Sequence, residues 1–456
     1  MSVPVVPVGV LCAVRGQGET AVVTVLDGAA GRVTVERRCA DLVELLAAAA
    51  AGVGRLAVVS ADLPRLDREA VAQLHLARVR VLALTEAGRG QAERMVALGV
   101  DAVLDDVAAG AVLVAAVLTL AAAAEEDLAG PSAGPSLLTA PDLTGRATGL
   151  DDRGAAAQAP AGTVVAVWGP TGAPGRSTVA INLAAELAAL GSAGLDASSG
   201  GPRGALLVDA DTYGGTIAQL LGMLDESPGL AAAARAAGQG TLDVLALSRL
   251  TPVLTPDLRV LTGISRANRW PELPASALDV VWDLARGLAA WTVIDCGFCL
   301  EQDEALSYDT RAPGRNAATL SALEAADVVV VVGSGDPVGI QRLVRGLTDL
   351  ANLAGPVAAR RVVVVNRLRV SAVGPRPGEA LRACLDRYAG IEDPHFVPDD
   401  RAGVDAATLR GASLLEASPG SPARRAIAAL AVLLAQPTPV PGRSGRRRAI
   451  RPGRRR

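Results

Sequence analysis

The stretch that decides the fold of this chain runs from Thr163 to Leu190 and reads TVVAVW, GPTGAPGRST and VAINLAAELAAL. The first six residues are apolar and largely β-branched, which predicts a buried strand, and the last twelve have the composition of a helix. In such a strand–turn–helix unit, backbone N–H groups and the helix N-terminus surround phosphates, while a Ser or Thr hydroxyl reaches Mg²⁺. The strict pattern ends in Gly-Lys-Ser/Thr, whereas this chain has Gly175-Arg176-Ser177. Taken alone, the stretch also fits an ordinary Gly-rich turn.

The residues around this stretch, 161–436, alternate short apolar runs with Ala- and Leu-rich segments. We expect strands at Thr163–Trp168, Ala205–Asp209, Leu258–Thr262, Trp291–Asp295, Asp327–Val332 and Arg361–Asn366. Apolar strands separated by helices predict a mostly parallel sheet covered on both faces, which is an α/β fold. Ligands of such sheets bind beyond the carboxyl ends of the strands.

Three of the expected strands end in polar residues. LLVDAD places Asp209 and Asp211 at a strand end, TVIDCG ends an apolar run on Asp295, and VVVVNR ends on Asn366. A single carboxylate at such a place is often a helix N-cap or a solvated edge. Three polar strand ends that follow a Gly-rich turn predict one shared site.

These motifs, in this order, resemble the MinD/ParA superfamily of deviant-Walker P-loop ATPases, and most of all its CpaE-like branch of pilus-assembly and septum-site-determining proteins. The turn is similar to the family loop xKGGxGK[ST]T, and LLVDADTYGGTIAQLLG is similar to VDxDxxxGxxxxxLG. VVVVNR resembles the strand whose Asn recognises adenine, and the stretch that begins FVPDD resembles the family's C-terminal part. The resemblance covers residues 161–436.

The resemblance implies ATP and Mg²⁺ as cofactors and a weak ATPase activity. The residues that would bind the nucleotide are Thr171, Gly172, Ala173, Pro174, Gly175, Arg176, Ser177, Thr178 and Asn366. The residues that would hold the metal are Ser177, Asp209 and Asp295. Asp211 would orient the attacking water, and Arg176 would act with it in catalysis by contacting the phosphates.

Three loop positions depart from the family pattern. Thr171 replaces the signature lysine, Arg176 replaces the loop lysine, and Ala173 replaces the second loop glycine. A guanidinium can pair with phosphate, but it is planar and larger than an ammonium group, and a Cβ at position 173 hinders close approach of the backbone. Hydrolysis is therefore left open. The alternative function is a scaffold of the same fold with a degenerate site that does not hydrolyse ATP.

Residues 1–125 resemble a response-regulator receiver, which often precedes CpaE-type ATPases. In LAVVSADLPRLD, Ser60 stands at the position of the phospho-accepting Asp, and Pro64 has the usual spacing. VLALT ends on Thr85, as a receiver's fourth strand does, while the acidic pair and the lysine of a working receiver are missing. We expect a flavodoxin-like pseudo-receiver that takes no phosphate. An unrelated α/β domain is the alternative.

Two segments have a composition that is typical of polypeptide outside a packed core. Residues 126–160 are rich in Gly, Pro, Ser and Ala, which predicts a flexible linker. Residues 437–456 contain eight arginines and no acidic residue, which predicts a disordered basic tail. Its positive charge would bind an anionic membrane surface, bind DNA, or only keep the protein soluble. Binding of DNA would favour a second alternative function, a ParA-type DNA partitioning ATPase.

Composition excludes several classes of site. All 44 basic residues are arginine, so no chemistry that needs a lysine is available, and the two histidines, His75 and His395, exclude a His-rich metal site. Five cysteines in 456 residues give no disulfide framework, as is typical of a reducing compartment. Cys296 and Cys299 form a lone CxxC motif, for which packing beside the nucleotide is the alternative to a redox pair or half a zinc site.

Two further stretches have open interpretations. Residues Val107–Ala124 are uncharged, which predicts a buried helix or a dimer-face helix more than a membrane span, because the run is short and its flanks are acidic. The polar insert EQDEALSYDTRAPGRNAAT contains Arg311 and Arg315, which would contact phosphate or a partner subunit, or simply be solvated.

Together these observations predict a cytoplasmic protein, peripheral at the inner face of the membrane where its tail binds lipid. We expect a nucleotide-dependent homodimer that acts with pilus, secretion or division proteins. Its function would be the spatial regulation of pilus or secretion assembly, or of septum placement.

Overall fold

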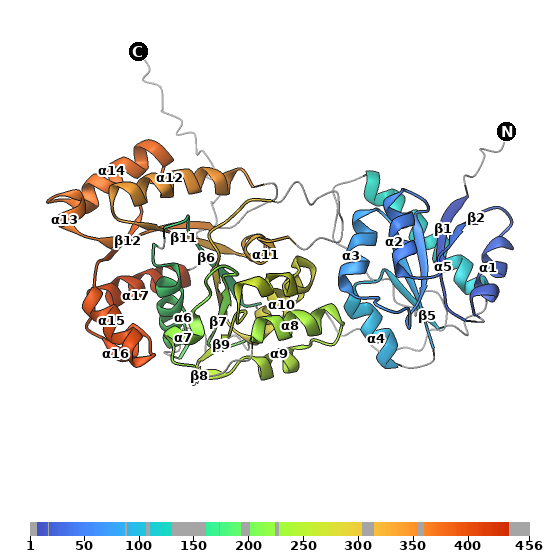
Figure 1. Cartoon of the computed structure of the whole chain (residues 1–456), viewed down its shortest axis with the longest axis horizontal. Coiled ribbons are helices and arrows are strands. Elements are labelled where there is room, and N and C mark those ends of the chain that lie inside the picture. The colour runs from blue at the N-terminus through green and yellow to red at the C-terminus, as the bar shows by residue number, and fades with distance from the viewer. Residues whose placement is uncertain are drawn as a thin grey trace, which may run out of the picture.

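A computed structural model describes residues 7–16, 18–86, 89–105, 110–129, 161–172, 174–192, 201–223, 228–302, 314–353 and 360–436. These residues form two layered α/β units, each built around its own sheet (Figure 1). The predicted α/β class with mostly parallel sheets is thereby confirmed. The basic tail, most of the linker, Ala173 and Arg311 lie outside the described residues.

The first unit is a five-stranded parallel sheet with the order β2-β1-β3-β4-β5. Its strands are β1 (Val8–Ala13), β2 (Val33–Arg38), β3 (Leu56–Ser60), β4 (Arg80–Thr85) and β5 (Ala102–Asp105). Its helices are α1 (Gly18–Asp27), α2 (Leu42–Ala50), α3 (Arg68–Leu76), α4 (Arg89–Leu98) and α5 (Gly110–Ala129). This strand order is that of the flavodoxin-like doubly wound folds.

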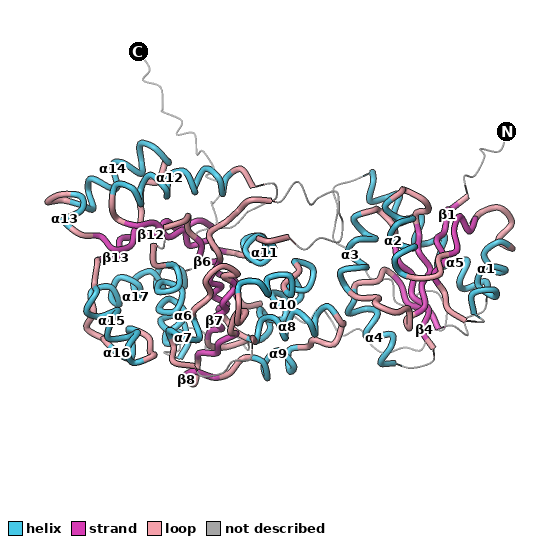
Figure 2. The backbone as a smooth tube through the Cα atoms, in the orientation of Figure 1, coloured by secondary structure: helices cyan, strands magenta, loops and turns pink. Residues whose placement is uncertain are grey.

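Helices lie on both faces of this sheet (Figure 2), and each face has its own apolar core. Helices α2, α3 and α4 cover one face with Leu45, Leu74 and Met95, while α1 and α5 cover the other with Leu26 and Val117. Within the described residues, no helix is long and apolar enough to cross a membrane. Helix α5 ends at Ala129, four residues inside the segment predicted to be a linker.

The second unit is an eight-stranded sheet with the order β13-β12-β11-β6-β10-β7-β9-β8, parallel except between β8 and β9. Its strands are β6 (Thr163–Trp168), β7 (Ala205–Ala210), β8 (Val253–Thr255), β9 (Leu258–Leu261), β10 (Trp291–Cys296), β11 (Val328–Ser334), β12 (Arg360–Leu368) and β13 (His395–Pro398). All six predicted strands are present, with ends that shift by one or two residues. The short edge strands β8 and β13 were not predicted.

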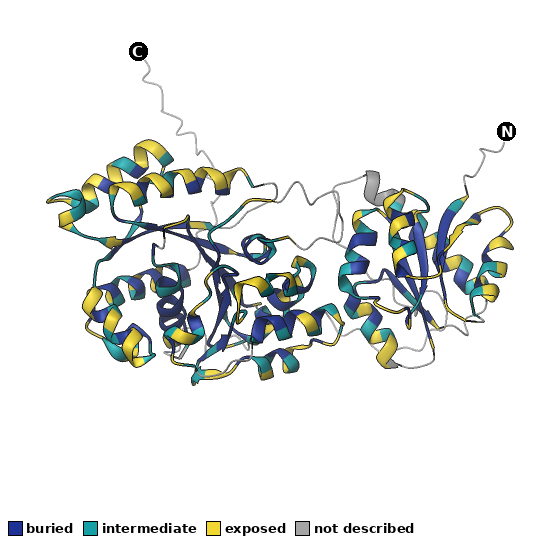
Figure 3. Ribbon diagram, in the orientation of Figure 1, coloured by how far each residue is buried: buried dark blue, intermediate teal, exposed yellow. Residues whose placement is uncertain are grey.

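Helices cover both faces of this sheet, and the strands between them are buried (Figure 3). One face carries α8 (Gly229–Gly238), α10 (Ala275–Leu288), α11 (Ala317–Ala325), α12 (Pro337–Ala351) and α14 (Pro377–Ala389), with α9 (Val244–Leu250) packed on α10. The other face carries α6 (Arg176–Ser192), α7 (Ile217–Leu220), α15 (Arg401–Arg410), α16 (Leu414–Ala417) and α17 (Pro422–Ala435). The second unit also contains the short helix α13 (Val370–Val373) and the 3₁₀ segment η2 (Ala267–Glu272).

The two units contact each other through α3 and α4 of the first and α8 and α10 of the second. The Arg68 guanidinium donates to the Ser276 carbonyl at 2.8 Å, and the Ser276 hydroxyl donates to Glu69 at 2.6 Å. Nearby, Arg94 donates to the carbonyl of Gln239 at 3.2 Å. These polar contacts join elements that are far apart in sequence.

Helix α6 is fixed against the C-terminal helices by buried polar contacts. Glu186 on α6 accepts two hydrogen bonds from the Arg424 guanidinium of α17, at 2.6 and 2.9 Å, and its side chain is 6% exposed. The Leu414 N–H donates to the Asn182 side chain of α6 at 2.6 Å. The C-terminal helices therefore hold the helix that begins at the Gly-rich turn.

We predict that Arg424→Ala lowers the free energy of unfolding by about 3 kcal/mol, because it leaves the buried Glu186 carboxylate without its partner. Urea denaturation followed by circular dichroism measures this loss. The matched control is Arg425→Ala, which removes an exposed guanidinium from the same helix and should change stability by less than about 0.5 kcal/mol. Equal effects of the two changes would contradict a specific role for the pair.

Candidate functional site

The turn between β6 and α6 has the backbone conformation that a phosphate loop requires. Gly172 and Gly175 have φ angles of 108° and 93°, which favour glycine. A Cβ at Gly175 would collide with the Asn366 side chain, so the close approach of β12 also requires glycine there. Helix α6 begins at Arg176, which places its N-terminal N–H groups at the end of the turn.

Arg176 lies back across the turn. Its Nη1 donates to the carbonyls of Gly169 and Pro170 at 3.0 and 3.3 Å, and its Nη2 lies 3.5 Å from a carboxylate oxygen of Asp211. The side chain is only 12% exposed, and its Nε has no partner among the described residues. The turn therefore holds a buried, permanently charged guanidinium with one donor still free.

Two carboxylates lie directly beside each other at the carboxyl ends of the central strands. Asp295 on β10 is opposite Asp209 on β7 in the parallel register. Asp209 is buried, and its two oxygens accept hydrogen bonds from the N–H groups of Asp211 and Ile217. Burial is the main reason that the pKa of Asp209 rises to about 7, and the Asp211 carboxylate adds to the effect.

Asp295 has no comparable set of donors. It is fully buried, and among the described residues neither carboxyl oxygen has a hydrogen-bond partner. Burial first, and the carboxylate of Asp209 second, raise the pKa of Asp295 well above its usual range. The Ser177 hydroxyl is close enough to lower this pKa somewhat, although it makes no hydrogen bond of normal geometry with the carboxyl group. A buried carboxyl without partners beside a hydroxyl is suited to a cation or its water shell.

Asp211 lies just beyond β7. One of its oxygens accepts the N–H groups of Tyr213 and Gly214 at 2.9 and 3.2 Å, while the other faces Arg176. The loop after it is fastened by Arg315, whose Nη2 donates to the Thr212 carbonyl at 3.0 Å and whose guanidinium lies 4.0 Å from the centre of the Tyr213 ring. Arg315 is therefore neither simply solvated nor placed in the loop that would bind phosphate.

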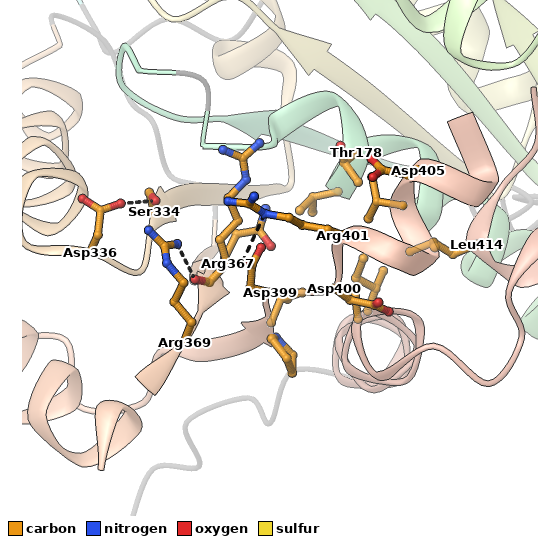
Figure 4. A pocket seen from close by; sticks show the side chains of 17 residues that line it. Thr178, Ser334, Asp336, Arg367, Arg369, Asp399, Asp400, Arg401, Asp405 and Leu414 are labelled. Carbon is orange, nitrogen blue, oxygen red and sulfur yellow. Dashed lines mark hydrogen bonds and ion pairs between the residues drawn. The ribbon is translucent and has the colours of Figure 1, made fainter. Parts of the chain in front are cut away.

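Asn366 connects the Gly-rich turn to a cavity. Its side-chain amide donates to the Pro174 carbonyl at 2.8 Å, and it lines a cavity of about 360 Å³. The lining also includes Thr178 at the start of α6, Asp336 at the start of α12, and Asp399 after β13 (Figure 4). A flat polar group that entered this cavity would lie next to the first turn of α6.

The structure brings most of the predicted residues into one place. Gly172, Pro174, Gly175, Arg176, Ser177 and Thr178 form the turn and the first turn of α6, and Thr171 lies exposed at its edge. Asp209, Asp211 and Asp295 line the sheet edge beside it, and Asn366 joins the turn to the cavity. Sequence reasoning missed Arg342 of α12, whose guanidinium lies against Gly172 of the turn, because an exposed arginine on a helix carries no motif. It also missed Asp336, which looks like an ordinary N-cap and is one.

The CxxC cysteines are free thiols that lie next to this site. Cys296 is completely buried, and burial followed by the Asp295 carboxylate raises the pKa of its thiol well above the usual value. A buried thiol of raised pKa is a poor nucleophile, so packing explains Cys296 better than redox chemistry does. No group of three His, Cys, Asp or Glu that could hold a metal occurs in the described part of the chain.

No family model matches this chain, and no curated protein matches it. Solved structures that it is similar to include the cell division ATPase MinD of Pyrococcus furiosus, with 18% identity and a TM-score of 0.45 over 60% of this chain and 98% of that one. A ParA family ATPase from Chlorobium tepidum has 18% identity and a TM-score of 0.49 over 60% and 99%.

A third similar structure is the septum site-determining protein MinD of Pyrococcus horikoshii, complexed with Mg-ADP. It has 17% identity and a TM-score of 0.44 over 60% of this chain and 96% of that one. Because one fold supports many functions, identities of this size do not assign a function to this chain.

We predict that Asp295→Asn stabilises the ligand-free protein more at pH 8 than at pH 5. The folded wild type binds the Asp295 proton more tightly than the unfolded chain does, so its stability falls as pH rises above the unfolded pKa of about 4 toward the raised pKa. The variant carries no proton there and escapes this loss. Melting temperatures between pH 5 and 8 measure the difference, and Asp349→Asn, an exposed change on α12, is the control. A difference that does not change with pH would contradict the prediction.

Proposed function

We propose that this chain binds ATP with Mg²⁺ between the turn at Gly169–Ser177 and the cavity beside Asn366. The observation that carries the proposal is the buried, unpartnered carboxyl group of Asp295 beside Ser177, at the sheet edge where the Gly-rich turn meets α6. Burial of this carboxyl without a partner is unfavourable, and a cation at the mouth of the loop compensates for it.

The residues present fit a magnesium nucleotide. The backbone N–H groups at the N-terminus of α6 would bind the phosphates, and the Nε of Arg176, which has no partner among the described residues, would add a donor. Ser177 and Asp295 would hold Mg²⁺, which neutralises phosphate charge when bound and needs few protein ligands. This requirement agrees with the lack of a larger metal-ligand cluster in the described residues.

The same geometry gives each remaining polar residue a role. Asp211 keeps one carboxylate oxygen fixed by two backbone N–H groups, so the other can orient a water or restrain Arg176. Asp209 is already bound by two N–H groups and would act through the position of Asp211 and of the loop. Asn366 would border the base, since it links the cavity to the turn.

At the level of the cell, we propose a MinD/ParA-like regulator that forms a nucleotide-dependent homodimer. Pilus or secretion assembly and septum placement are the processes that the sequence resemblance suggests, with an anionic membrane or DNA as the surface for the arginine-rich tail. A scaffold that binds ATP without hydrolysis is the second candidate. It is favoured by the neutral Thr171 and by the engagement of Arg176 with loop carbonyls and Asp211.

We predict that the purified chain binds ATP with Mg²⁺ and that Arg176→Ala weakens binding at least tenfold, or about 1.4 kcal/mol. Isothermal titration calorimetry with and without Mg²⁺ measures the dissociation constants. Arg176→Lys should retain part of the affinity, and Arg249→Ala, an exposed change on α9, should retain all of it. If the wild type does not bind at millimolar ATP, the proposed function fails. A protein that binds but shows no phosphate release over hours would favour the scaffold.

For the first unit we propose a pseudo-receiver that signals without phosphorylation. Ser60 ends β3 where a receiver has its acceptor, and its hydroxyl accepts the N–H of Arg15 at 3.3 Å. The Arg15 guanidinium pairs with Asp62 at 3.2 Å, so a cation occupies the edge where a phospho-acceptor site holds a divalent metal. Thr85 ends β4, with its hydroxyl directed at the Leu104 carbonyl.

We predict that acetyl phosphate with Mg²⁺ leaves the mass of the intact chain unchanged. The physical reason is that position 60 has no carboxylate to form an acyl phosphate, and the neighbouring Arg15 opposes metal binding. Ser60→Asp is the informative second variant, because the acceptor alone should not restore phosphorylation while Arg15 remains. An adduct of one phosphate mapped to an Asp of the first unit in the wild type would disprove the pseudo-receiver.

A further inference from the structure

Helix α12 lies directly against the Gly-rich turn. Gly346 is buried there, and a Cβ at this position would lie 3.1 Å from the Trp168 ring and 3.2 Å from Cβ of Pro170. One turn earlier on the same face is Arg342, since residues four apart on a helix are neighbours. Its guanidinium lies over the backbone of Gly172, where an added Cβ would collide with Nη1. Two separate contacts thus fix α12 relative to the turn.

Arg342 is exposed and has no ion-pair partner among the described residues. The positions three and four residues away on α12 are Val338, Gly339, Arg345 and Gly346, and none of them is acidic. A solvated arginine needs no particular position, but this guanidinium lies against Gly172, a loop glycine whose φ of 108° disfavours a side chain. Because Gly172 has no side chain, its backbone lies directly against the Arg342 guanidinium.

The position of Arg342 along α12 indicates which part of a nucleotide it would meet. Asp336, the N-cap of α12, lines the cavity beside Asn366. Arg342 is six residues further on, which is about 9 Å along the helix axis at the usual rise per residue. A nucleotide with its base in the cavity would run alongside α12 and reach Arg342 with its phosphates, at the end farthest from the base.

The charges of the side chains at the site would also favour a second positive side chain near a terminal phosphate. Asp209, Asp211 and Asp295 lie at the sheet edge, Arg176 is the guanidinium inside the turn, and Thr171 is neutral. Arg176 already contacts Asp211, so part of its charge is balanced within the protein. A terminal phosphate would still lack a free positive side chain, and Arg342 provides one from the same chain.

We infer that Arg342 contacts the terminal phosphate of a bound nucleoside triphosphate and so distinguishes it from the diphosphate. The inference rests on the proposed nucleotide site and adds a residue that no motif marks. Arginine suits the role because its planar donors can form two parallel hydrogen bonds with phosphate oxygens. Release of the terminal phosphate would remove this contact of Arg342, while Gly346 would keep α12 packed on the turn.

The test compares the affinities of the full chain for two ligands, Mg²⁺ with the non-hydrolysable analogue AMPPNP and Mg²⁺ with ADP. We expect Arg342→Ala to weaken AMPPNP binding at least tenfold and to change ADP binding less than twofold. Arg342→Lys should recover part of the lost affinity. Arg345→Ala, which removes an exposed arginine from the same helix, is the matched control and should change neither affinity.

Several outcomes overturn the inference. Equal losses for both ligands, an equal loss in Arg345→Ala, unchanged AMPPNP affinity, or tighter binding by Arg342→Ala each contradict contact with the terminal phosphate. If the wild type binds ADP and AMPPNP but Arg342→Ala behaves like it, only this inference fails. If the wild type binds neither, the proposed nucleotide function fails and the inference fails with it. Unchanged melting temperatures for the variants show that folding does not account for the result.

Discussion

The constraint on which the second unit depends is the burial of a carboxyl group, Asp295, at the end of a central strand with no hydrogen-bond donor of its own. Such a group is unfavourable in an apolar core unless it is protonated or faces a cation. Burial is the main cause of the raised pKa of Asp295 and also of the raised pKa of the adjacent Asp209. A core built only for stability would place an apolar residue there, and the proposed cation would account for the carboxyl group.

The elements around this sheet edge fix the positions of the Gly-rich turn and of the helices beside it. The turn keeps its backbone close to the site through glycines at Gly172 and Gly175, and Asn366 fastens the turn from β12 through Pro174. Helix α6 is held by the Glu186–Arg424 pair, and α12 packs on the other side of the turn through Gly346. Elements on both sides thus position the loop, which is the usual arrangement of a binding site on a scaffold.

Much of this arrangement is predictable from sequence, for physical reasons. Buried parallel strands are continuous apolar runs, so the positions of β6 and β10 follow from composition, and their carboxyl ends place Asp209 and Asp295 together once the sheet is parallel. The edge strands β8 and β13 are too short for such a pattern. Arg342 was beyond sequence, and Arg315 was noted without the contact it makes, because both depend on which loop lies against them in space. Pairing partners such as Glu186 and Arg424, 238 residues apart, also require the fold.

The lack of lysine has a consequence for how this site responds to its surroundings. An arginine remains charged at any physiological pH, whereas a buried lysine can lose its proton. Arg176 and Arg342 therefore give the loop a fixed positive charge, and the protons that exchange near neutral pH belong to the carboxyl groups. In the proposed site, Asp295 would have to release its proton to hold a metal ion at full strength, and Asp209, with a pKa of about 7, would change the charge beside it. If the proposed nucleotide function holds, affinity for Mg²⁺ would depend on pH through these carboxyl groups, whereas the charge of the two guanidinium groups would not change.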